Sequence, residues 1–161
     1  MTMDPKTLKA LELQIITFIN SYKRFDEIID GKNIIFNKDF EVPMTIMGTW
    51  RQQINQEQKQ LSVIRELMPD GFQFIHKLEE FVIAQEQFLD NSIKWSVFYN
   101  KTSNNISREV LEVNKRRSLK NRELGHQIDT LLIAAQELLY KETGLDIMNY
   151  VLHKLKYQNR F

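Results

Sequence analysis

The sequence predicts an all-α fold, an antiparallel up-down bundle of four long helices with a short C-terminal helix, in a single domain over residues 1–161. The leading observation is that large aromatic residues recur at intervals of seven: Phe74, Phe81, Phe88 and Trp95. Seven residues make two helical turns, so these rings form one stripe along a helix. A second observation is that five Gly and three Pro leave few positions that would break a helix.

The first helix is predicted from Pro5 to Asp30. Asp4 can cap its N-terminus, and Pro5 occupies the first helical position, where its missing N–H costs nothing. Apolar residues then recur at intervals of three and four until Asp30 and Gly31, which end the pattern. The following segment, 32–43, does not have a helical pattern and is expected to be either a small β-hairpin or an irregular connector.

The second and third helices are predicted over residues 45–68 and 72–99. Pro69, Asp70 and Gly71 make a turn so short that the two helices should be antiparallel neighbours. Glu57 falls in the apolar seam of the second helix. The section of this helix around Glu57 is rich in amide side chains, so one of its faces is expected to be exposed to solvent.

The segment 106–142 is harder to interpret, because one apolar stripe begins it, a second ends it, and Asn114–Glu123 between them holds a single apolar residue. One helix of this length would be about 55 Å long and would overshoot the others. Either it breaks or bends near Arg117–Asn121, which the pattern favours, or it protrudes and needs a partner. Asp146 can cap a last short helix, and the tail 154–161 is expected to fray.

The composition argues against several classes of protein. The absence of Cys excludes a disulfide scaffold, a thiolate metal site and a Cys nucleophile. The sequence has no run of about 18 apolar residues, so no membrane span is expected. The first residues lack the basic start and apolar core of a signal peptide. These features together predict a cytoplasmic location and no membrane partner.

No catalytic residue, cofactor or metal site is predicted. Paired Glu and His residues can hold metal ions inside helical bundles, and the chain has Glu123 three residues before His126 and His76 three residues before Glu79. An antiparallel arrangement of the third and fourth helices would bring Glu79 and His126 to one height. Both pairs nevertheless fall on the sides of their helices away from the apolar stripes, so they are expected to face solvent.

Charge is uneven along the chain. Arg65–Asp90 carries two positive and six negative residues, net −4, whereas Ser107–Arg122 carries six positive and two negative, net +4. The blocks either complement each other within the bundle or form a docking surface for an acidic partner. Clustered cations also suit phosphate groups, although consecutive cations fan out around a helix. The residues of this nucleic-acid-binding alternative are Lys115, Arg116, Arg117, Lys120 and Arg122.

The function expected from these patterns is that of a non-enzymatic protein-interaction module, such as an adaptor, a regulator or an assembly subunit. Its partner would be another protein, a second copy of itself, or both. Self-association is expected through the apolar residues at the start of the fourth helix, which are Ile106, Val110 and Val113. Binding of nucleic acid through the basic cluster is the alternative.

Overall fold

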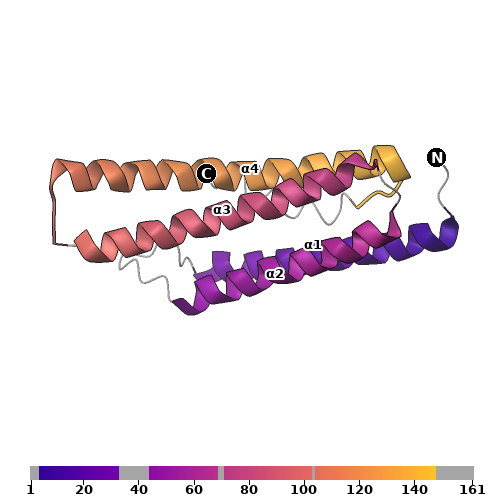
Figure 1. Cartoon of the computed structure of the whole chain (residues 1–161), viewed down its shortest axis with the longest axis horizontal. Coiled ribbons are helices and arrows are strands. Elements are labelled where there is room, and N and C mark those ends of the chain that lie inside the picture. Colours follow the sequence, from indigo (N-terminus) through magenta and orange to yellow (C-terminus); the bar gives the residue numbers. More distant parts are fainter. Residues whose placement is uncertain (1–3, 33–43, 69–70, 103, 148–161) are drawn as a thin grey trace.

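The computed structural model describes residues 4–32, 44–68, 71–102 and 104–147, which form four α-helices (Figure 1). The described residues contain no strand, so the all-α prediction is confirmed for them. The hairpin or connector predicted over 32–43 lies outside the described residues except for Lys32, which belongs to α1. The short helix predicted after Asp146 lies outside them except for Ile147, and the tail 154–161 lies wholly outside them. The helices are α1 (Pro5–Lys32), α2 (Met44–Leu67), α3 (Gln73–Thr102) and α4 (Arg108–Thr143).

Consecutive helices run in opposite directions, with α1 and α2 side by side below α3 and α4 in Figure 1. Trp50 of α2 lies beside Phe88 of α3, with ring centroids 5.1 Å apart. Fifteen residues further along α2, Arg65 pairs with Glu79, so α2 and α3 are antiparallel. At the left of Figure 1, the end of α3 and the start of α4 extend beyond α1 and α2.

The aromatic stripe of α3 forms the centre of the core, as the sequence predicts. Phe81 is fully buried, with its ring centroid 4.8 Å from that of Tyr22 and 6.0 Å from that of Phe18, both on α1. The other three aromatic residues of the stripe are also buried. Burial of rings of this size contributes much of the stability of a core, so α3 organises the packing of its neighbours.

Polar contacts inside the bundle involve the amide-rich part of α2. Glu57 is only 1% exposed, and the amide of Gln85 on α3 donates a 2.8 Å hydrogen bond to it, which confirms its predicted place in the seam. Gln53 donates a 3.0 Å hydrogen bond to Ser21 on α1. Gln52 and Gln56 are exposed, so this section of α2 also has the solvent-exposed face expected from the sequence.

Helix α4 is one continuous helix without a sharp bend (Figure 1), so the break or bend favoured near Arg117–Asn121 is wrong. Ser107 caps its N-terminus by accepting a hydrogen bond from Val110 N, and Gly144 ends it with a φ of 78°. The break does not occur because the polar segment faces Asn91 and Ser92 of α3, which form hydrogen bonds with Arg117 and Asn121. At about 1.5 Å per residue, α3 is about 45 Å long and α4 about 54 Å long, so α4 has a helical partner along most of its length.

The far end of the α3–α4 pair is fixed by Glu142. Its carboxylate accepts hydrogen bonds from Gln73 N at 2.7 Å and from Phe74 N at 2.8 Å. These N–H groups belong to the first turn of α3, where no intrahelical acceptor is available and the helix dipole favours a negative charge. The last turn of α4 therefore caps the first turn of α3 and sets the register between the helices.

Replacing Phe81 by Ala should lower the free energy of unfolding by about 3–5 kcal/mol, because the substitution leaves a cavity at the centre of the core. Urea denaturation followed by circular dichroism measures this loss. Ile83→Ala is the matched control, since Ile83 lies half-exposed on the outer face of α3 and should cost much less. Equal stabilities of the two variants would contradict the central role of the Phe81 ring.

Candidate functional site

A buried polar layer joins α3 and α4 near the middle of the pair. Asn91 donates a 2.5 Å hydrogen bond to Asn121 and a 3.1 Å hydrogen bond to the backbone oxygen of Arg117. The guanidinium of Arg117 donates back to Asn91 Oδ1 at 3.0 Å. Asn121 also donates to Ser92, whose hydroxyl donates to the backbone oxygen of Phe88. Because each of these polar groups has a hydrogen-bond partner, their burial costs little free energy. The same hydrogen bonds specify one register for the two helices.

A second polar contact lies closer to the loop between α3 and α4. The indole N–H of Trp95 donates a 3.1 Å hydrogen bond to Asn114 Oδ1. Both Trp95 and Val110 are buried. The polar segment of α4 can therefore remain helical, because its inward side chains form hydrogen bonds with polar groups of α3. The Trp95 ring beside them supplies apolar contact.

The structure divides the predicted basic cluster. Arg117 is half-buried, with its guanidinium bound to Asn91, so it serves the helix–helix contact. The other four cations are exposed, and none has a hydrogen-bonding or ion-pair partner among the described residues. They lie on two flanks of α4, because each residue advances about 100° around the helix. Lys115 and Arg122 share one flank, and Arg116 and Lys120 share the other.

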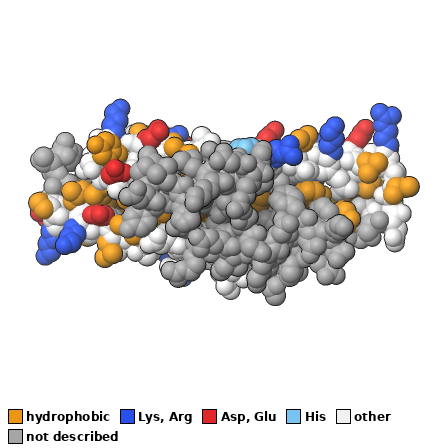
Figure 2. Space-filling view, turned by 180° about the vertical axis from the view of Figure 1, so that it is seen from behind, with side chains coloured by type: hydrophobic (Ala, Val, Ile, Leu, Met, Phe, Trp, Pro, Cys, Tyr) orange, Lys and Arg blue, Asp and Glu red, His pale blue; other side chains and the backbone are white. Residues whose placement is uncertain are grey.

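Exposed apolar side chains accompany these cations. Leu111 is 59% exposed and Leu119 is 46% exposed, both in the first half of α4, and Val97 of α3 is also exposed. Figure 2 shows orange hydrophobic and blue cationic side chains together at the right-hand end, where α3 ends and α4 begins. Scattered single apolar residues are ordinary on a surface, whereas a grouping of them is a candidate site for interaction.

The residues predicted for self-association differ in accessibility. Ile106 is 87% exposed in the loop before α4. Val113 is half-buried, and Val110 is buried within the protein. Ile106 is therefore the one of the three that is fully accessible to another molecule.

The candidate metal pairs are not brought together. Glu79 faces α2, where it pairs with Arg65, and His126 is exposed on α4. The contacts of Asn91 with Asn121 and of Phe74 with Glu142 fix the register, which leaves Glu79 and His126 roughly two to three turns apart along the pair. Among the described residues, no group of three or more His, Asp or Glu side chains could hold a metal ion.

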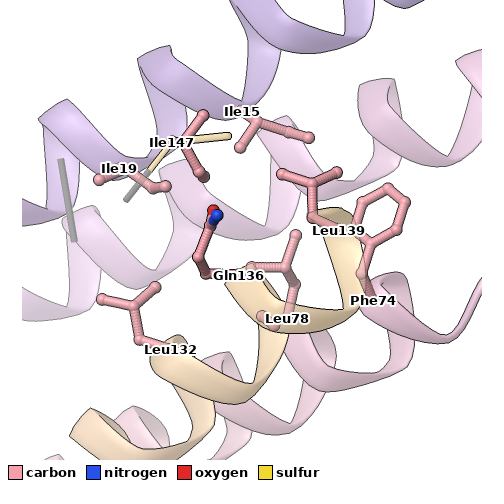
Figure 3. A pocket seen from close by; sticks show the side chains of 9 residues that line it. Ile15, Ile19, Phe74, Leu78, Leu132, Gln136, Leu139 and Ile147 are labelled. Atoms are coloured by element: carbon pink, nitrogen blue, oxygen red, sulfur yellow. The ribbon is translucent and has the colours of Figure 1, made fainter. Parts of the chain in front are cut away.

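A small cavity lies at the opposite end of the bundle (Figure 3). About 10 Å³ of it is open to the centre of a water molecule, which is room for one water at most. Gln136 of α4 points into it, and its buried Oε1 has no hydrogen-bond partner among the described residues. The remaining lining is apolar and comes from α1, α3, α4 and the residues after α4, so the cavity suits neither catalysis nor a sizeable ligand.

Comparison with known proteins adds no relative: no family model, no curated protein and no solved structure matches the chain. In the part of the chain that the structure describes, no helix has the length and apolar character needed to cross a membrane.

The buried polar layer was missed by analysis of the sequence. Its signal is the Asn91-Ser92 pair inside the aromatic stripe of α3, which coincides with the polar stretch of α4 once the register is known. The apolar periodicity of each helix shows where polar residues interrupt its own stripe. It does not show that the interruption in α3 faces the one in α4.

Asn91→Ala should lower the free energy of unfolding by about 1–3 kcal/mol, since it removes hydrogen bonds that the buried Asn121 amide and the Arg117 guanidinium need. Thermal and urea denaturation give the value. Gln87→Ala is the control, because Gln87 is an exposed amide on the same helix and should have little effect. A loss no larger than that of the control would mean that the polar layer contributes nothing to stability.

Proposed function

We propose that this protein is a non-enzymatic interaction module that binds another protein through the protruding end of the α3–α4 pair. The observation that carries the proposal is the grouping there of exposed apolar and cationic side chains, including Ile106, Leu111 and Leu119. Water disfavours exposed leucines, and a protein partner can cover them while its acidic groups pair with the cations. The cytoplasmic location predicted from the sequence remains part of this proposal.

Self-association also remains a prediction. Ile106 supports it, because this side chain is the most exposed large apolar group among the described residues.

Nucleic-acid binding is the second candidate, and the four exposed cations without ion-pair partners among the described residues favour it. The exposed leucines count against it, because phosphate groups gain nothing from contact with apolar side chains. The division of the cations between two flanks also limits how many can reach one phosphate backbone at a time.

Capture from native lysate, with and without nuclease, tests the first candidate. The wild-type protein should retain a defined set of proteins after nuclease treatment, and the double variant Leu111→Asp with Leu119→Asp should lose them. Leu13→Asp is the matched control, because Leu13 is 63% exposed on α1 and takes the same substitution at a distance from the protruding end. Proteins that are lost with nuclease, or that persist in the double variant, would argue against the proposal.

Fluorescence anisotropy with labelled DNA and RNA at two salt concentrations tests the second candidate. If phosphate binding is the function, Lys115→Glu and Lys120→Glu should each weaken binding and reduce its salt dependence, since each removes a phosphate contact. Leu111→Ala and Leu119→Ala leave the charge unchanged and should bind as the wild type does. Absence of binding at low salt would rule out this candidate.

A further inference from the structure

Five residues in the first half of α4 form a single exposed stripe. They fall within about 80° of arc on a helix that turns about 100° per residue, and they alternate between cation and leucine. We call them the α4 outer stripe: Arg108, Leu111, Lys115, Leu119 and Arg122.

Every member of the α4 outer stripe is exposed. Arg108 pairs with Glu112 at the edge of the stripe, at 3.4 Å, and both side chains remain largely in solvent. Lys115 and Arg122 have no ion-pair partner among the described residues. The stripe therefore presents two leucines, flanked and separated by cations, with no covering from the described helices.

Charge argues against a second copy as the occupant of this face. The stripe has the same order from either end, because its intervals are three, four, four and three. Two copies packed antiparallel would place Leu111 against Leu119 but also Lys115 against Lys115. A parallel pair would likewise place each cation against itself. Like charges facing each other across an interface oppose association, so the stripe suits a partner with the opposite charges.

The spacing indicates the shape of the partner. Leu111 and Leu119 are eight residues apart, about 12 Å along the axis. A helix lying along α4 has the same rise, so it can place apolar residues against both leucines and carboxylates against the intervening and flanking cations. The five positions of the stripe span about 21 Å, which an extended strand covers in about six residues with only about three on one face, so a strand cannot match them.

We propose that the α4 outer stripe binds an acidic amphipathic helix of a protein partner, in which glutamate or aspartate alternates with leucine-like residues at matching intervals. This inference rests on the proposed interaction function and deepens it by naming the partner's chemistry. Contact of carboxylates with Arg108, Lys115 and Arg122 sets specificity, and burial of the two leucines supplies the apolar contribution.

The probe is a labelled, alanine-rich helical peptide with Glu, Leu, Glu, Leu and Glu at intervals of three, four, four and three. Fluorescence anisotropy against the full chain should show saturable binding that weakens as salt rises. A second peptide, in which Gln replaces both Leu, keeps the charge and should bind about tenfold more weakly, because the apolar contribution is lost. A DNA single strand of similar length is the third probe and should bind more weakly than the Glu–Leu peptide.

Two matched variants separate the stripe from general electrostatics. Lys115→Glu and Lys120→Glu change the charge of the protein equally, and both residues are exposed on α4. Lys115 lies at the centre of the stripe, whereas Lys120 lies on the other flank. The first variant should weaken binding of the Glu–Leu peptide about tenfold or more, and the second should change it less than about threefold. Circular dichroism melting should show both variants folded as the wild type is.

Four results would overturn the proposal: no binding of the Glu–Leu peptide, equal binding of the Glu–Gln peptide, equal weakening by the two lysine variants, or tighter binding of DNA. These results are distinct from failure of the interaction function itself. If lysate proteins still depend on Leu111 and Leu119 but the Glu–Leu peptide does not bind, the module stands and the acidic helix is rejected. If the peptide binds but no lysate protein depends on the leucines, the stripe binds acidic helices, and the proposed interaction function is rejected.

Discussion

Burial of the aromatic stripe of α3 is the constraint on which the remaining structure depends. The Phe81 ring contacts two aromatic side chains of α1, and the Phe88 ring contacts Trp50 of α2. Each of these rings removes a large apolar area from water, and this removal is the main driving force of folding. Helix α3 therefore cannot shift along its axis without separating several rings at once, and the positions of its neighbours are fixed with it.

The pairing of α3 with α4 adds a second, more specific constraint. Apolar contact alone tolerates small slips between helices, whereas the Asn91–Asn121 hydrogen bond and the Glu142 cap hold at one register. The hydrogen bonds lie near the middle of the pair, and the cap lies where α3 begins and α4 ends. Together they hold α4 straight beside α3 beyond the reach of α1 and α2, and this arrangement exposes the first half of α4.

The sequence was sufficient to predict the all-helical fold, the burial of the Phe81 stripe and the seam position of Glu57. These features follow from local spacing or local turn chemistry. Continuity of α4 could not be predicted in this way, because its polar segment becomes acceptable only through Asn91 and Ser92 on another helix. Likewise, the spread of the cations around α4 follows from the spacing, but the identity of the one that faces α3 depends on the register.

The register between α3 and α4 also determines which residues of α4 lie on the surface. Once Asn121 faces α3, helical geometry places Arg117 near the interface and leaves Lys115, about 160° from Arg117 around the axis, on the opposite side. Arg117 thus stabilises the α3–α4 pair, while Lys115 is available to a partner. Because Leu111 and Leu119 flank Lys115 on the same face, the buried hydrogen bonds that align α3 and α4 also determine which apolar residues remain uncovered. The proposed interaction surface therefore depends on the polar layer that sets the register of α4.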